Sequence, residues 1–97
     1  MEELGFVWDD NKAAANKQKH GIAFGEAVTA FYDDYARVIS DCDHSVYEER
    51  FLLLGMSAEL RILVVCNCYR EKDNHIRIIP ARRAVKREQQ QYWEFRT

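Results

Sequence analysis

Residues 24–40 contain the change of pattern that decides the fold, and they read FGEAVTAFYDDYARVIS. Apolar and aromatic side chains recur at helical spacing from Phe24 to Tyr32, which places them on one face of a helix. Asp33 and Asp34 are expected to stop this helix, and from Tyr35 onward the apolar period drops to two, as in a strand. The stretch therefore predicts a helix that leads directly into a β-sheet.

The period of two continues downstream and predicts further strands. The alternating apolar sets are Ala36/Val38, Leu52/Leu54/Met56, Ile62/Val64/Cys66 and Ile76/Ile78. The connections at 41–45, 57–59 and 70–74 are short and polar, which suits hairpins and is too short for the crossovers of a parallel sheet. We therefore expect an antiparallel meander.

The two ends of the chain predict the remaining elements. A short strand at Phe6–Trp8 is followed by a helix through Asn11–Lys19, with an aspartate as its N-cap and Gly21 after its last turn. Residues 81–95 predict a final helix with a polar middle. The expected fold class is α+β: a small single domain, residues 1–97, in which two N-terminal helices and one C-terminal helix pack on the sheet.

Composition limits the class of protein. The chain has 97 residues, 47% of them hydrophobic and 31% charged, which predicts one folded domain and excludes disordered and fibrous classes. Its apolar runs are far shorter than a membrane span. The acidic start, Met1 to Leu4, lacks the features of a signal peptide, so we expect a cytoplasmic protein.

Charge is divided unevenly along the chain. Residues 1–49 have a net charge of −7 and residues 50–97 a net charge of +5. The densest basic group lies in the second half and comprises Arg77, Arg82, Arg83, Lys86 and Arg87. Guanidinium groups bind phosphate through two parallel hydrogen bonds, so this group predicts an anion site. The alternative is a solvated basic face, or ion pairs with Glu48 or Glu49.

Other candidate residues carry weaker signals. Lys19 and His20 end the first helix, where His20 could exchange protons near neutral pH or simply cap the helix. Tyr92 on the last helix could stack an unpaired base or pack in the interior. We expect Cys66 and Cys68 to be packing residues. The polar segment 41–50 resembles a metal loop in composition but has no glycine at a bend, so no metal site is predicted.

Three separated blocks of sequence together resemble one known family. The first runs from Phe6 and Trp8 through Lys19-His20-Gly21 to Glu26-Ala27, the second is Glu49-Arg50-Phe51 with Gly55 and Ser57, and the third runs from Ile76 to Ala84. In this order they are similar to the BrnT toxins of bacterial type II toxin–antitoxin systems. The resemblance covers nearly the whole chain.

This resemblance implies a fold like that of the RelE-type ribonucleases. It also implies RNA cleavage that halts translation and inhibition by a BrnA-like antitoxin, whose DNA-binding domain makes the complex a repressor of its own operon. The chain departs from the family pattern at Pro80, where a serine is common. The proline removes a backbone donor at the end of the last predicted strand.

RNA can be cleaved without a metal or cofactor, because its 2′-hydroxyl attacks the adjacent phosphorus once a base removes the proton. With the family in view, the catalytic candidates are His20, Glu49, Arg77, Arg82 and Arg83, the arginines as phosphate clamps and His20 or Glu49 as the proton-transfer group. The RNA-binding candidates are Lys19, Arg50, Lys86, Arg87 and Tyr92. No cofactor is expected, and the expected partners are the RNA substrate and the antitoxin, with operator DNA contacted only through the antitoxin.

Two other readings remain open at this point. In one, the basic surface is only a docking face for an acidic antitoxin segment, and the protein is a binding module without activity. In the other, the chain is an inactive relative retained as a transcriptional co-repressor. Cleavage of RNA by the isolated protein in EDTA separates both from the enzyme.

Overall fold

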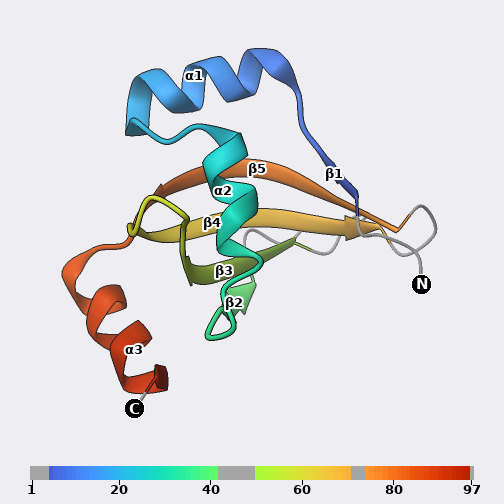
Figure 1. Cartoon of the computed structure of the whole chain (residues 1–97). Coiled ribbons are helices and arrows are strands. Elements are labelled where there is room, and N and C mark those ends of the chain that lie inside the picture. The colour runs from blue at the N-terminus through green and yellow to red at the C-terminus, as the bar shows by residue number, and fades with distance from the viewer. Residues whose placement is uncertain (1–4, 42–49, 71–73, 97) are drawn as a thin grey trace.

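The computed structural model describes residues 5–41, 50–70 and 74–96 (Figure 1). Their elements, in chain order, are β1 (Gly5–Val7), α1 (Asp10–His20), α2 (Phe24–Ala30), β2 (Arg37–Asp41), β3 (Arg50–Met56), β4 (Ile62–Arg70), β5 (His75–Arg83) and α3 (Lys86–Arg96). The α+β class predicted from the sequence is confirmed.

The described strands form one sheet with the order β1-β5-β4-β3-β2. Strands β2 to β5 pair antiparallel with their sequence neighbours, as the short connections predicted. Strand β1 instead pairs in parallel with β5, so that Gly5 lies opposite His75. The expectation of a purely antiparallel sheet was wrong for this edge strand, because β1 and β5 are distant in sequence and no hairpin limits their direction.

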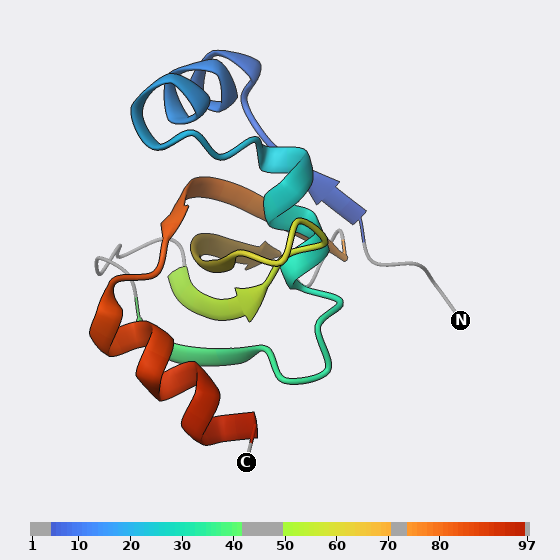
Figure 2. The same cartoon turned by 60° about the vertical axis from the view of Figure 1, so that its left-hand side comes forward.

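Helices cover both faces of the sheet. Helix α2 crosses one face of the sheet (Figure 1). Its buried side chains pack on Leu53, Leu63 and Ile78. Helix α3 packs against the other face, where Leu54, Val64 and Tyr92 belong to a second, smaller cluster. Figure 2 shows α1 and α3 at opposite ends of the molecule. The alternation of neighbouring residues between the two clusters is the period of two that the sequence displays.

Helix α1 has the predicted ends. The Asp9 side chain accepts hydrogen bonds from the backbone N–H groups of Asn11 and Lys12, at 2.8 and 3.1 Å. Gly21 follows with φ of 73° and donates its N–H to Lys17 O. The left-handed backbone conformation at this position favours glycine, because glycine has no Cβ. Helix α2 ends at Ala30, earlier than the predicted Tyr32.

The last strand and the last helix divide the chain differently from the prediction. Residues 81–83 were expected to begin the helix, but they continue β5 and pair with residues 63–65 of β4. The helix begins at Lys86. Pro80 lies where the register between β4 and β5 shifts, which is a position that tolerates the loss of a backbone N–H. Strand pairing has therefore overridden the local helical pattern.

The two cysteines of β4 differ in their bonding. Cys68 is buried and forms no disulfide, as expected, whereas Cys66 is disulfide-bonded, which corrects the expectation that it is only a packing residue.

Within the described residues, no helix has the length and apolar character needed to cross a membrane.

Candidate functional site

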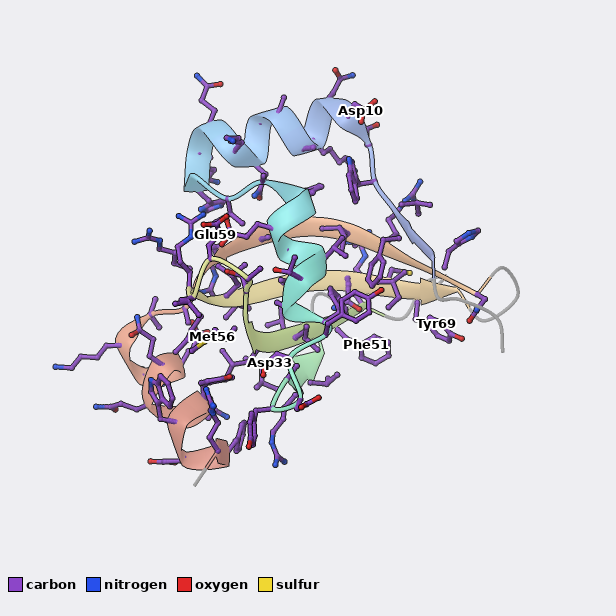
Figure 3. The ribbon with its side chains drawn as sticks, viewed as in Figure 1. Asp10, Asp33, Phe51, Met56, Glu59 and Tyr69 are labelled. Atoms are coloured by element: carbon purple, nitrogen blue, oxygen red, sulfur yellow. The ribbon has the colours of Figure 1, made fainter. Side chains whose placement is uncertain are left out.

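A hollow of about 330 Å³ lies at the end of the sheet where β3, β4, β5 and α3 meet. We call it the sheet-end hollow, and its lining residues are Met56, Leu60, Arg61, Ile62, Arg83, Gln89 and Trp93. The turn between β3 and β4 forms one side, and Figure 3 shows Met56 between this turn and α3. Two arginines, an amide and an indole thus share one small space, a set suited to a phosphate and a base.

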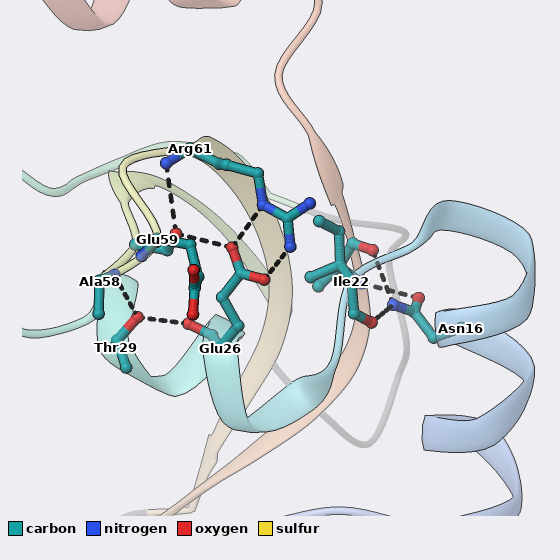
Figure 4. Close-up of polar contacts among 9 residues, drawn as sticks. Asn16, Ile22, Glu26, Thr29, Ala58, Glu59 and Arg61 are labelled. Atoms are coloured by element: carbon teal, nitrogen blue, oxygen red, sulfur yellow. Dashed lines mark hydrogen bonds and ion pairs between the residues drawn. The ribbon is translucent and has the colours of Figure 1, made fainter.

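Arg61 is held in place by a polar network that joins α2 to the β3–β4 turn (Figure 4). Its guanidinium donates to both carboxylate oxygens of Glu26, with Nε at 2.9 Å from Oε2. The hydroxyl of Ser57 donates to the same oxygen at 2.7 Å. The hydrogen bonds from Arg61, followed by that from Ser57, hold the pKa of Glu26 below its usual value despite partial burial. Glu26 is therefore a paired anion that positions Arg61.

Arg82 and Arg83 point to opposite faces of the sheet. Arg82 lies opposite Val64, on the α3 side, and Arg83 lies opposite Leu63, on the α2 side. Arg82 donates two hydrogen bonds to Glu88, at 2.8 and 2.9 Å. Arg83 is exposed and forms no ion pair within the described residues. Of the two adjacent arginines, Arg83 is the one open to a ligand.

Tyr92 is not available to stack a base, which corrects the prediction made for it. Its side chain is fully buried, and its hydroxyl donates to Oδ2 of Asp33 at 2.6 Å. The next residue, Trp93, is 47% exposed and lines the sheet-end hollow. The two rings meet edge to face with centroids 5.3 Å apart. The exposed aromatic group on α3 is therefore Trp93, oriented by the buried Tyr92.

A second hollow, of about 280 Å³, lies between α1 and β5. We call it the α1 hollow, and its lining residues are Lys12, Ala15, Asn16, Lys19, His20, Ile79 and Pro80. The predicted residues Lys19 and His20 thus share a site, but it is separate from the one that holds Arg83. His20 is half-buried at the end of α1.

Asn16 fixes α1 to the sheet beside this second hollow (Figure 4). Its side-chain amide donates to Ile22 O at 2.9 Å and to Ala81 O at 2.8 Å, and its oxygen accepts from the N–H of Ala81 at 3.0 Å. The amide therefore pairs with β5 as a neighbouring strand would. This satisfies the backbone groups of Ala81, which are buried and would otherwise lack partners.

Arg50 and Arg77 lie away from both hollows. Each is paired with Cys68, one from β3 and the other from β5. Arg83 lies opposite Leu63 of β4, whereas Arg77 lies opposite Cys68. Leu63 and Cys68 are five residues apart on β4, so Arg77 and Arg83 are separated by about 17 Å along the sheet. Figure 3 shows Glu59 and Tyr69 near these two ends of β4. The structure thus separates Arg77 from Arg83, which were predicted to act together.

The remaining predicted residues are placed as follows. Lys86 and Arg87 are exposed in the first turn of α3. Glu49 lies outside the described residues. Among the residues that the structure describes, no three potential ligands of the histidine, cysteine, aspartate and glutamate types gather in a way that could hold a metal ion.

Sequence reasoning missed Arg61, Gln89 and Trp93 as lining residues. Arg61 stands alone after a turn, outside the basic group, and only the tertiary contact with Glu26 reveals its place. Trp93 could have been found, since Tyr92, Trp93 and Phe95 fall within four positions of one helix and cannot all face one core. The spacing does not say which ring is exposed, and in the structure it is Trp93, at 47%.

Comparison with known proteins now supplies a family. The family model described as ribonuclease toxin, BrnT, of type II toxin–antitoxin system matches residues 8–88. The structure is similar to the 1.1 Å crystal structure of the Brucella abortus ribonuclease toxin BrnT, with a TM-score of 0.65 and 21% sequence identity over 87% of this chain and 100% of that one. This similarity supports the fold assignment alone. No curated protein matches the chain.

Proposed function

The chain belongs to the BrnT family of type II ribonuclease toxins, and from this premise we propose that it is a metal-independent endoribonuclease that inhibits translation in the cytoplasm. The observation that carries the proposal is the sheet-end hollow, in which Arg61, Arg83 and Trp93 meet. Guanidinium groups and an exposed indole are the groups that bind phosphate and an unpaired base. Single-stranded RNA offers both.

In the proposed site, Arg83 contacts the scissile phosphate. Its guanidinium is exposed and forms no ion pair among the described residues, so a phosphate can bind it without displacing a hydrogen-bonded carboxylate. Arg61 adds a second positive charge, and its bonds to Glu26 fix its orientation. Trp93 provides the surface for a base. Because both arginines are held by strand and turn, they can meet the charge that develops on phosphorus with little rearrangement.

The proposed reaction begins when a base removes the proton of the 2′-hydroxyl. The 2′-oxygen then bonds to phosphorus, the bond from phosphorus to the 5′-oxygen breaks, and an acid gives a proton to that leaving oxygen. The products carry a 2′,3′-cyclic phosphate and a 5′-hydroxyl. Arg83 stabilises the phosphorane-like transition state, which has more negative charge on its equatorial oxygens than the substrate.

The proton-transfer group is best sought outside the two paired carboxylates. Hydrogen bonds from Arg82 hold the pKa of Glu88 below its usual value, and those from Arg61 do the same for Glu26. Both are weak bases at neutral pH. His20 therefore remains the proposed base or acid, since it lines the α1 hollow with Pro80, three residues from Arg83 on β5. Arg77 lies opposite Cys68, far along β4 from Arg83, and Glu49 directly precedes Arg50, which lies opposite the same Cys68. We therefore leave Arg77 and Glu49 out of the proposed site.

Type II toxins act with an antitoxin, and we propose a BrnA-like protein as the partner. It covers the basic surface formed by the end of β5 and by α3, including the exposed Trp93, and it blocks cleavage while it is bound. The complex represses its own operon through the DNA-binding domain of the antitoxin. Hydrogen exchange tests the placement, since residues 77–96 should become protected in the complex, and equal exchange with and without antitoxin would refute it.

One observation favours a second candidate function. Two carboxylates beside the arginines are already in ion pairs, because Glu26 bonds Arg61 and Glu88 bonds Arg82. A docking module or co-repressor needs cations and no base, and it fits this arrangement without further residues. The two functions differ in one simple respect, which is whether the isolated chain cleaves RNA.

The test uses the purified full chain, free of antitoxin, with a labelled single-stranded RNA in EDTA. We expect cleavage to survive chelation and the fragments to carry 2′,3′-cyclic phosphate and 5′-hydroxyl ends. Cleavage that is lost in EDTA and restored by magnesium would exclude the metal-independent mechanism, as would 5′-phosphate ends. A chain that binds the antitoxin but leaves RNA intact would support the docking function.

A further inference from the structure

One face of α1 is turned toward the outer edge of β5. Lys12, Asn16 and Lys19 follow one another at intervals of four and three residues, so they share this face. Asn16 anchors it through its bonds to Ala81. Lys17 is exposed on the same helix but does not line the α1 hollow. Two of the three lysines of α1 are thus directed to one space.

The lining of the α1 hollow combines an apolar floor with a basic rim. Ala15, Ile79 and Pro80 are its apolar lining, which we call the floor, and Lys12, Lys19 and His20 are its basic lining, which we call the rim. The lining includes no carboxylate. Neither lysine forms an ion pair within the described part of the chain. The charge of this rim is therefore free to meet an anion.

The polar groups near the floor already form hydrogen bonds within the protein. The amide of Asn16 donates to Ile22 and Ala81 and accepts from Ala81, and Pro80 has no N–H to offer. A ligand in the hollow therefore contacts both apolar surface and positively charged side chains. A nucleotide, with a flat base and a charged phosphate, has this combination of properties.

The α1 hollow also lies close to the proposed site of cleavage. Pro80 and Arg83 are three residues apart on β5, or about 10 Å. Along α1, Lys12 and Lys19 are seven residues apart, which is also about 10 Å. The basic rim thus continues from the end of β5 along α1, over a length that spans more than one nucleotide of an extended strand.

We propose that the α1 hollow is a binding subsite for a nucleotide next to the cleaved bond, with Lys12 and Lys19 on the backbone phosphates and Ile79 and Pro80 under the base. The inference rests on the proposed ribonuclease function, because it places the same RNA strand in both hollows. It adds that the enzyme grips its substrate by contacts outside the reacting phosphate. These contacts tolerate different sequences, since no free hydrogen-bonding amide lies at the floor.

The test measures binding of an eight-nucleotide RNA with 2′-O-methyl groups, which cannot be cleaved by 2′-oxygen attack. The dissociation constant is determined by fluorescence anisotropy at several salt concentrations for the full chain and for Lys12→Ala, Lys19→Ala and Lys17→Ala. Each lost phosphate contact should lower the slope of log affinity against log salt by about 0.7. We expect this decrease for Lys12→Ala and Lys19→Ala, and an unchanged slope for the matched control Lys17→Ala.

Equal slopes for all three variants would overturn the subsite, because they would show that only overall charge matters. The subsite would also be refuted if Lys12→Ala and Lys19→Ala weakened antitoxin binding and left RNA binding unchanged. Failure of the proposed function appears elsewhere: the wild-type chain would bind the methylated RNA with the predicted slopes and yet leave unmodified RNA intact. Circular dichroism of each variant verifies that α1 is still formed.

Discussion

The two faces of the sheet are held to their helices by different forces. On the α2 face, Phe24, Leu63 and Val65 belong to an almost fully buried aliphatic and aromatic core. On the α3 face the apolar cluster is smaller, and polar contacts join it. Tyr92 donates to Asp33, and the guanidinium of Arg37 lies 4.4 Å from the centre of the Phe95 ring.

This difference shows where the candidate site gets its shape. The α2 face is stabilised by burial, which is non-directional and depends on volume. The α3 face depends on a few oriented contacts, and α3 supplies Gln89 and Trp93 to the sheet-end hollow. The geometry of the hollow should therefore be more easily disturbed than the fold as a whole.

The largest effect on stability is expected on the α2 face. Phe24 is 2% exposed, so Phe24→Ala removes a large buried side chain and should lower the free energy of unfolding by about 3–5 kcal/mol. Val85 is 56% exposed, and Val85→Ala should change this energy by less than about 0.5 kcal/mol. Urea denaturation followed by circular dichroism measures both. Similar values for the two variants would contradict the core assigned to this face.

A smaller and more local effect is expected on the α3 face. Tyr92→Phe keeps the ring and removes one hydrogen bond to a carboxylate, which should lower the free energy of unfolding by about 1.5–3 kcal/mol. Hydrogen exchange should increase most in α3. Tyr35→Phe is the control, because the hydroxyl of Tyr35 has no hydrogen-bond partner in the described residues and its removal should leave stability unchanged. An equal loss in both variants would exclude the bond to Asp33 as the cause.

The same bond should make the α3 face sensitive to high pH. Burial and the hydrogen bond to Asp33 raise the pKa of Tyr92 to about 12. A raised pKa means that the stabilisation is complete below the unfolded value of about 10 and is lost as the pH rises through about 12. We expect stability to fall in this window in the wild type, and to fall much less in Tyr92→Phe. Identical alkaline transitions would contradict the assignment.

Asp33 should make stability sensitive to low pH, because its pKa is lowered in the folded protein whereas that of Tyr92 is raised. Burial alone would raise the pKa of Asp33, but hydrogen bonds from Tyr92, Met56 and Tyr35 hold it below its usual value. The stability that this carboxylate contributes is therefore present above the unfolded pKa of about 4 and is lost as the pH falls below it. Thermal unfolding of Asp33→Asn should show a weaker acid dependence than that of the wild type.

The sequence predicted the α2 face better than the α3 face for a physical reason. Burial leaves a periodic pattern, so the helix from Phe24 and the alternation in β3 and β4 could be read directly. Oriented contacts between distant residues, such as Tyr92 with Asp33, leave no pattern in a single chain. The parallel pairing of β1 and the continuation of β5 to Arg83 were missed because both depend on a neighbouring strand.

The candidate site was predicted only in part for the same reason. The basic group at the end of β5 was visible as a run of charges, but a run of charges does not show which member is paired. Arg82 pairs with Glu88, six residues away in the sequence, and Arg61 pairs with Glu26, 35 residues away. Only the folded chain brings Arg61 and Glu26 together. Arg83 emerged as the open cation from this elimination, and Trp93 replaced Tyr92 as the exposed ring.

The central claim is that RNA is cleaved at the end of β5, and comparison of two arginines on that strand tests it most directly. The measurement is the single-turnover rate of RNA cleavage by Arg83→Ala and by Arg77→Ala, both exposed in the wild type. Loss of one donor to the transition state should slow Arg83→Ala by about 10²–10³-fold, and Arg77→Ala should keep nearly full activity. Arg83→Lys should also be slow, because an ammonium cannot replace a planar guanidinium. A fully active Arg83→Ala, or an equal loss in Arg77→Ala, would contradict the site.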